Sequence, residues 1–251
     1  MRKRIVAGNW KMNLDHREGA RLAGEIRDGL KNRVPPCEVV VIPPFTSLQA
    51  VGDTLRGSCV SLGAQDLWYE DSGAFTGEVS AGMISAAGCR YVLVGHSERR
   101  HILCEGPDLL SRKVRAAIKG GLSPIYCVGE LLEEREAGRA EKTVSRQVEE
   151  VLGGLDAGGM SKLAIAYEPV WAIGTGKTAT AGDASGMHKV IRDLLSRLFG
   201  PGTAGETPIL YGGSVKPDNA RALLSAGDID RALVGGASLA SDSFLGIVFP
   251  A

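Results

Sequence analysis

The chain has 251 residues, 44% of them hydrophobic, and its 29 basic residues balance its 29 acidic residues to a formal net charge of zero. This composition excludes a disordered chain, and the lack of a basic excess argues against binding to nucleic acid or to anionic membranes. The first apolar run is too short for a signal peptide, and no stretch is long enough for a membrane span. The five cysteines are odd in number and lack metal-binding spacing. We therefore expect a cytoplasmic protein without a metal ion.

Short apolar, β-branched runs alternate along the chain with longer segments of helical periodicity. This alternation favours parallel strands joined by right-handed crossovers, and eight such units in about 250 residues match a (β/α)8 barrel. A doubly wound open sheet is the alternative, but no glycine-rich dinucleotide fingerprint follows the first strand. No linker divides the chain, so we predict one α/β barrel domain over residues 1–251. The predicted strands are 5–7, 39–42, 60–62, 91–94, 124–128, 163–167, 209–211 and 232–234, and the clearest predicted helices are 17–32, 107–119, 131–152, 181–198 and 216–226.

The sixth predicted strand is followed by the most informative stretch of the chain. It ends in Glu168, and Pro169 comes next, fixing its own φ and pushing Glu168 out of the helical region. The following loop is apolar yet glycine-rich, which suits a flap that closes over a ligand better than a solvated connection. The pattern predicts a base working under a lid. The alternative is a buried carboxylate before an ordinary strand-to-helix loop.

Other strand ends carry groups that complement Glu168. Asn9 and Lys11 follow the first strand, and His96 follows the fourth, whereas the seventh and eighth strands end in paired glycines. Paired glycines let backbone N–H groups approach an anion closely, and barrels of this class often bind phosphate at that place. A lone histidine or a lone Gly-Gly is weak evidence. Their common placement at strand ends predicts a site at the carboxyl-terminal face of the barrel.

These motifs identify a family resemblance that covers essentially the whole chain. The sequence resembles triosephosphate isomerase, a TIM-barrel family. The resemblance implies cofactor-free interconversion of D-glyceraldehyde 3-phosphate and dihydroxyacetone phosphate by proton transfer through an enediolate, in glycolysis and gluconeogenesis. The matching segments are Asn9-Trp10-Lys11, Gly73-Ala74-Phe75-Thr76-Gly77-Glu78, Gly95-His96-Ser97-Glu98-Arg99-Arg100, residues 166–176 from Ala-Tyr-Glu-Pro to Gly-Thr-Gly, Tyr211-Gly212-Gly213-Ser214 and Val234-Gly235-Gly236-Ala237-Ser238-Leu239.

The resemblance implies a role for each group at the strand ends. Glu168 would be the base that moves a proton between carbons 1 and 2, and desolvation under the lid would raise its basicity. His96 would donate a hydrogen bond as neutral imidazole. Lys11 would supply positive charge, with the Asn9 amide beside it. Glu98 would hold Lys11, unless it is only an acid at a helix N-terminus. Phosphate would be held by backbone N–H groups of Gly174, Ser214, Gly235 and Gly236.

The resemblance also defines a lid, residues 169–177. Its closure would exclude water and protect the enediolate phosphate. Tyr211 and Ser214 would bond the closed lid, and Glu130 would hold Trp171 in the open one. Besides Gly174, the lid comprises Pro169, Val170, Trp171, Ala172, Ile173, Thr175, Gly176 and Lys177.

A long connection, residues 65–80, follows the third strand and is called the dimer loop below. Loops of this length in compact domains are usually functional. In the family this loop packs against a neighbouring subunit, which implies a homodimer with Thr76 close to the partner's active site. The alternative is a loop folded on its own barrel. Asp66 departs from the family, in which many members carry Asn at this position.

Two other functions compete with this interpretation. An inactive phosphate-binding barrel that serves as a scaffold should have lost Lys11, His96 or Glu168 while keeping the glycines, but all three are present. Another sugar-phosphate isomerase, such as an amino-sugar isomerase, would need a different motif after the sixth strand. We therefore expect triose phosphates as substrates, with no nucleic-acid or membrane partner.

Overall fold

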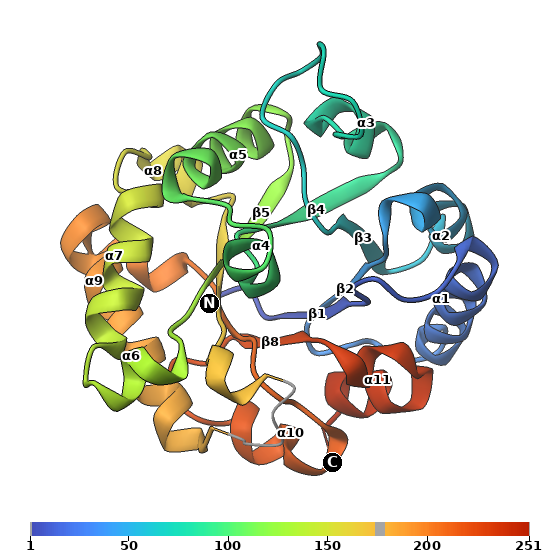
Figure 1. Cartoon of the computed structure of the whole chain (residues 1–251). Coiled ribbons are helices and arrows are strands. Elements are labelled where there is room, and N and C mark those ends of the chain that lie inside the picture. Colours follow the sequence, from blue (N-terminus) through green and yellow to red (C-terminus); the bar gives the residue numbers. More distant parts are fainter. Residues whose placement is uncertain (1, 174–178, 251) are drawn as a thin grey trace.

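Eight parallel strands form a closed barrel in the computed structural model, which describes residues 2–173 and 179–250. Each strand pairs with its neighbours in sequence, and β1 closes the barrel against β8 (Figure 1). All eight predicted strands are confirmed, with ends that differ by at most two residues. The strands are β1 (Ile5–Asn9), β2 (Glu38–Ile42), β3 (Val60–Ala64), β4 (Cys89–Val94), β5 (Ser123–Val128), β6 (Ala164–Tyr167), β7 (Ile209–Tyr211) and β8 (Arg231–Val234).

The helices form a ring around the barrel (Figure 1). The predicted helix 131–152 is wrong as one element, because Gly138 adopts φ +67° and separates α6 from α7. The predicted helix 181–198 continues as α9, with a non-helical break at Gly200. The described helices are α1 (His16–Leu30), α2 (Leu48–Leu55), α3 (Ala81–Ala86), α4 (Ser97–His101), α5 (Pro107–Lys119), α6 (Leu132–Glu136), α7 (Ala140–Leu152), α8 (Ala157–Met160), α9 (Ala181–Glu206), α10 (Pro217–Leu224) and α11 (Ser241–Val248), with short 3₁₀ turns η1 (Phe45–Ser47), η2 (Val170–Ala172) and η3 (Gly236–Leu239).

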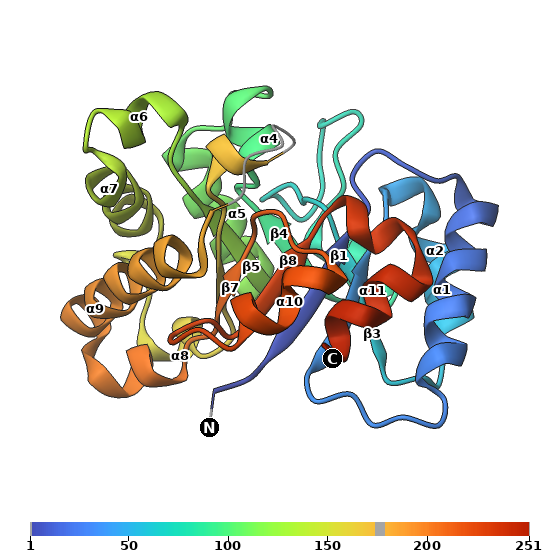
Figure 2. The ribbon, with the colours of Figure 1, turned by 90° about the horizontal axis from the view of Figure 1, so that it is seen from below.

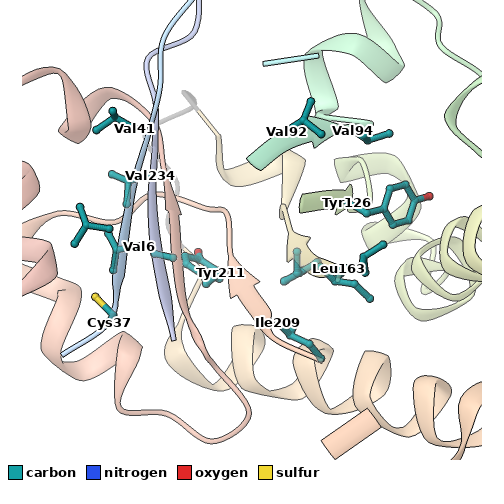
Figure 3. Packing of buried hydrophobic residues seen from close by; sticks show 14 of the residues in the cluster. Val6, Cys37, Val41, Val92, Val94, Tyr126, Leu163, Ile209, Tyr211 and Val234 are labelled. Atoms are coloured by element: carbon teal, nitrogen blue, oxygen red, sulfur yellow. The ribbon is translucent and has the colours of Figure 1, made fainter. Parts of the chain in front are cut away.

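Alternation along the strands divides the apolar core into two layers. Ile5 and Ala7 of β1 point into the barrel, whereas Val6 between them points outward toward the helices. The outer layer is the larger one, and Figure 3 shows part of it, including Val6, Val41 and Tyr126. Both layers are almost fully buried, so the strands sit in a rigid frame.

Parallel strands place all eight carboxyl ends on the same rim. Seen from the side, α4, α6 and η2 lie at this rim, and the N-terminus emerges at the opposite end of the barrel (Figure 2). The polar strand-end residues predicted from the sequence therefore share one face of a rigid scaffold. Among the described helices, none combines the length and the apolarity needed to cross a bilayer.

Candidate active site

The end of β1 is held in an unusual backbone conformation. Lys11 has φ +52°, a left-handed conformation that is costly for a side chain of this type. Its N–H donates to Asn9 Oδ1 at 3.0 Å, and Gln65 Nε2 donates to the Lys11 carbonyl at 2.8 Å and to the Ile42 carbonyl at 3.1 Å. These hydrogen bonds offset the strain and fix the direction in which the Lys11 side chain leaves the strand.

The structure brings Glu98 to Lys11. Lys11 Nζ lies 2.7 Å from Glu98 Oε1, and both side chains keep contact with solvent. A pair with this exposure adds little to stability. Its effect is to hold the ammonium group at the mouth of the barrel.

Glu168 and His96 form the buried centre of the site. Glu168 Oε1 lies 3.0 Å from His96 Nε2, and the Ser97 N–H donates to Glu168 Oε2 at 2.8 Å. His96 is the N-cap of α4, and the Glu98 N–H donates to its Nδ1 at 3.3 Å. A ring nitrogen that accepts a hydrogen bond carries no proton, so this contact favours neutral imidazole with its proton on Nε2, donated to Glu168.

The two groups shift one another's pKa. Burial opposes the charged form of Glu168, but hydrogen bonds and charge from His96, the Ser97 N–H and Lys11 outweigh it and lower the pKa of Glu168. Burial likewise opposes the charged imidazole, but the Glu168 carboxylate outweighs it and raises the pKa of His96. In this arrangement the pKa of Glu168 is lowered because the carboxylate is hydrogen-bonded to protein. The expected rise in basicity concerns the closed lid, part of which lies outside the described residues.

The ends of β7 and β8 present backbone to the site. A Cβ on Gly212 would lie 2.8 Å from Glu168 Cγ, and one on Gly213 would overlap the Tyr211 hydroxyl. A Cβ on Gly235 would lie 3.6 Å from Lys11 Cε, whereas Gly236, at the start of η3, faces open space. Glycine is required at Gly212 and Gly213 for close packing, and it leaves the backbone at Gly235 and Gly236 accessible.

A cavity of about 640 Å³ is lined both by the side chains that follow β1, β4 and β6 and by the glycines that follow β7 and β8. Its dimensions suit a small phosphorylated metabolite. A base, an imidazole, an ammonium and accessible backbone around one cavity can move a proton and bind an anion. Within residues 2–173 and 179–250, no three His, Cys, Asp or Glu residues are arranged as metal ligands. The predicted site residues that line the cavity are Asn9, Lys11, His96, Glu168, Ile173, Ser214, Gly235 and Gly236.

The described part of the lid is anchored at its base. Pro169 precedes η2, which contains Val170, Trp171 and Ala172, and Ile173 reaches the cavity. The Trp171 indole N–H donates to Glu130 Oε1 at 2.8 Å, as expected for the open lid. The remaining predicted lid and phosphate residues of this segment, Gly174, Thr175, Gly176 and Lys177, lie outside the described residues.

The dimer loop extends away from the barrel. It projects beyond the ring of helices near α3 in Figure 1, and Thr76 at its end is exposed. Phe75 packs on Trp68 with ring centroids 5.3 Å apart, yet 37% of its surface stays accessible. Other large apolar side chains in the segments that follow β1, β2, β3 and β4 are also exposed: Met12, Phe45, Met83, Ile102 and Leu103.

Sequence reasoning missed three residues that contact the site. Ser97 holds the Glu168 carboxylate through its backbone, Gln65 holds the Lys11 backbone, and Arg135 contacts both Glu130 and Trp171. Backbone donors leave no mark in the residue type. Gln65 is the first residue of the dimer loop, and its position as a polar residue directly after a buried strand was the available signal.

A closed (β/α)8 barrel with an acid, an imidazole and an ammonium around a cavity at its strand ends belongs to the class of barrel enzymes. The family model described as triosephosphate isomerase matches residues 4–251. Triosephosphate isomerases of Syntrophotalea carbinolica and Roseiflexus castenholzii are 51% and 52% identical over 248 residues, which cover 99% of this chain and 98% and 97% of those relatives. The one from Bacteroides fragilis is 46% identical over 99% of this chain and 98% of its own. The chain belongs to the triosephosphate isomerase family.

Proposed function

We propose that this chain, acting as a single domain over residues 1–251 in the cytoplasm, interconverts D-glyceraldehyde 3-phosphate and dihydroxyacetone phosphate in glycolysis and gluconeogenesis. The observation that carries the proposal is the convergence of Glu168, His96 and Lys11 on one cavity whose lining also includes the glycines that follow β7 and β8. Proton transfer between adjacent carbons needs no redox partner, so the reaction needs no cofactor.

Glu168 is the proposed base. It removes a proton from one carbon of the substrate and returns it to the neighbouring carbon. In the described arrangement its two oxygens are occupied by His96 and the Ser97 N–H. A substrate that takes the place of these partners frees the carboxylate, and exclusion of water then raises its basicity.

His96, Lys11 and Asn9 are the proposed electrophilic groups. Neutral imidazole with its proton on Nε2 donates to the carbonyl oxygen and then to the enediolate oxygens. The Lys11 ammonium offsets the negative charge of the enediolate and the phosphate, and the Asn9 amide supports it through the Lys11 N–H. Glu98 keeps Lys11 in place.

The phosphate binds at the ends of β7 and β8. Backbone N–H groups of Ser214, Gly235, Gly236 and the lid residue Gly174 donate to its oxygens. The lid, residues 169–177, closes over the bound substrate, with Tyr211 and Ser214 as its partners in the closed form. Closure protects the enediolate from loss of phosphate into water.

The active form is a homodimer. The projecting dimer loop supports this assembly, as do the exposed Phe75 and the other exposed apolar side chains in the segments that follow β1 to β4. Their burial against a second chain would remove apolar surface from water. Thr76 of one subunit then lies near Asn9 and Lys11 of the other. Replacing residues 66–78 with a tight turn should give folded monomers whose turnover is lower by orders of magnitude. Sedimentation and kinetics on the same variant test this, and fully active monomers contradict it.

The central experiment is a coupled assay of isomerase activity on dihydroxyacetone phosphate, before and after dialysis against a chelator. We expect turnover that survives the chelator. Phosphate binding without turnover supports the alternative, an inactive barrel that serves as a scaffold. Turnover lost on dialysis and restored by a divalent ion contradicts cofactor-free proton transfer.

A further inference from the structure

Arg135 on α6 contacts the chain on both sides of residues 174–178. The first side, called the first flank, is η2 with its partner Glu130, and the second flank is the start of α9. On the first flank its Nη1 lies 3.3 Å from Glu130 Oε1, and its guanidinium carbon stacks 4.6 Å from the centre of the Trp171 ring. On the second flank its Nη2 lies 2.5 Å from Asp183 Oδ1 in the first turn of α9. One side chain therefore bridges the segment that enters the lid and the helix that follows it.

The first flank depends on a buried carboxylate that Arg135 neutralises. Glu130 is fully buried, and its Oε1 also accepts from the Tyr167 hydroxyl at 3.0 Å and from the Trp171 indole at 2.8 Å. Those two donors are neutral, and Glu130 Oε2 has no partner among the described residues. A buried carboxylate without a cation is costly, so the nearby charge of Arg135 offsets the burial of Glu130, which in turn holds Trp171.

The second flank depends on the cap of α9. The Asp183 side chain accepts from the Thr180 N–H and hydroxyl, and its N–H donates back to Thr180 Oγ1. This reciprocal cap fixes where α9 begins. Arg135 adds a charged contact to the same carboxylate. The pKa of Asp183 is lowered mainly by the hydrogen bonds from Thr180 and further by the charge of Arg135.

Both α6 and the loop before it are hydrogen-bonded to α7, and in α6 the contact is Thr143 Oγ1 donating to Glu134 Oε1 at 3.0 Å. Gln147 of α7 accepts from the Gly129 N–H at 2.8 Å and donates to the Gly129 carbonyl at 2.9 Å. Displacement of Trp171 from Glu130 would therefore also break its stacking contact with the Arg135 guanidinium. We infer that Arg135 is a positioning residue that ties both flanks of the lid in the described arrangement and so sets the free-energy cost of closing it. The inference rests on the proposed function, because it assigns the lid the closing role described there.

Two consequences distinguish this role from simple packing. Loss of Arg135 should weaken the contacts that hold Trp171 on Glu130. A ligand that needs the lid closed should then bind more tightly. A cation–π contact together with a partly buried ion pair predicts a change of about three- to tenfold in ligand affinity. A purely structural role predicts lower thermal stability with weaker or unchanged ligand binding.

The test uses the full chain labelled with 5-fluorotryptophan, with the Trp171 resonance assigned from a Trp171→Phe sample. Arg135→Gln is compared with Arg135→Lys and with Arg139→Gln, a matched control just beyond α6 for which no side-chain contact is described. Inorganic phosphate is the probe. We expect Arg135→Gln to move the Trp171 resonance of the free enzyme toward its phosphate-bound position and to lower the Kd for phosphate about three- to tenfold, with partial restoration in Arg135→Lys.

The inference is overturned if Arg135→Gln matches Arg139→Gln in resonance and Kd, or if it binds phosphate more weakly. Asp183→Asn separates the flanks: a resonance shift there of the same sign supports a tie between them, and no shift contradicts it. Failure of the proposed function appears separately, as a wild-type chain without isomerase activity, whereas the resonance and the phosphate Kd still decide the role of Arg135.

Discussion

The rim of this barrel has two unlike halves. The ends of β1, β4 and β6 carry chemistry in side chains, namely Lys11, His96 and Glu168. The ends of β7 and β8 carry glycines, whose contribution is exposed or closely packed backbone. The difference fits the division of labour in the proposed function, in which side chains act on the atoms that change and backbone holds the part of the ligand that does not.

The two halves also fail in different ways. On the side-chain half, replacement removes or moves a functional group while the surroundings stay intact. On the backbone half there is no group to remove, so replacement can only add atoms. Gly212 shows the consequence, because a Cβ there would press on Glu168 Cγ and displace a side chain of the other half. Matched substitutions in the two halves therefore test whether the division holds.

Glu168→Asp should have the largest effect. Loss of one methylene withdraws the carboxylate by about 1 Å, and misplacement of that size costs on the order of a hundredfold in rate. Binding of inorganic phosphate should change far less, because the phosphate-binding backbone is untouched. Steady-state kinetics and phosphate titration on the same variant provide the measurement. Near-normal turnover would remove Glu168 from the role of base.

Gly212→Ala should come next, with a loss of roughly ten- to a hundredfold in kcat, since the added methyl group displaces Glu168 by a fraction of the distance lost in Glu168→Asp. Gly186→Ala is the matched control: this exposed glycine of α9 has open space around its Cβ position. We expect the control to keep full activity and to gain up to about 1 kcal/mol in stability. Equal kinetics for the two variants would contradict steric coupling between the halves.

The sequence was sufficient for the fold because its signals were local and repeated. Each strand is a short apolar run such as that of β2, and each crossover helix has its own periodicity. Parallel pairing then brings all strand ends to one rim, so the placement of Lys11, His96 and Glu168 around one cavity followed from topology. The break at Gly138 was missed because residues on both sides of it have helix-forming composition.

The supporting contacts could not be read from the sequence. The hold on Glu168 comes from the Ser97 N–H, a group that every residue except proline possesses. In the described arrangement the direction of the Glu168 pKa shift depends on that contact and on His96, which together outweigh burial. The burial of His188 could not be read from the sequence either. This side chain is fully buried beside Tyr167 and Tyr211, and burial lowers its pKa to about 4.

Asp66 is buried just after the end of β3, and its ionisation should make the free energy of unfolding depend on pH. It contacts Lys113 at 2.7 Å and Arg99 at 2.9 Å, yet burial, together with the nearby Glu105, raises its pKa to about 6 from 3.8. Because the folded pKa is raised, the stability that Asp66 contributes is present below about pH 4 and is lost as pH rises through 6. This change amounts to about 3 kcal/mol.

Asp66→Asn removes that titration, so its melting temperature relative to wild type should rise between pH 4 and pH 7. Thermal unfolding at a series of pH values measures the difference. Asp71→Asn, an exposed carboxylate in the same loop, is the control and should run parallel to wild type. A flat difference curve for Asp66→Asn would show that its ion pairs fully offset its burial.

Gln65→Leu should have the smallest effect and probes how precisely the side-chain half must be held. Gln65 donates to the carbonyls of Lys11 and Ile42, and Lys11 sits in a left-handed conformation that these bonds help to maintain. Loss of a hydrogen bond of this kind costs about 1 kcal/mol, which corresponds to roughly fivefold in rate if it is expressed at the transition state. We expect that loss in kcat, with little change in the Kd for phosphate, because Lys11 is mispositioned while the β7 and β8 backbone is unaltered. Gln49→Leu on α2, an exposed glutamine, is the control and should leave the kinetics unchanged. A weaker phosphate Kd with unchanged kcat in Gln65→Leu would instead mean that Lys11 serves the binding half of the rim, and the boundary between the two halves would have to be moved to β4.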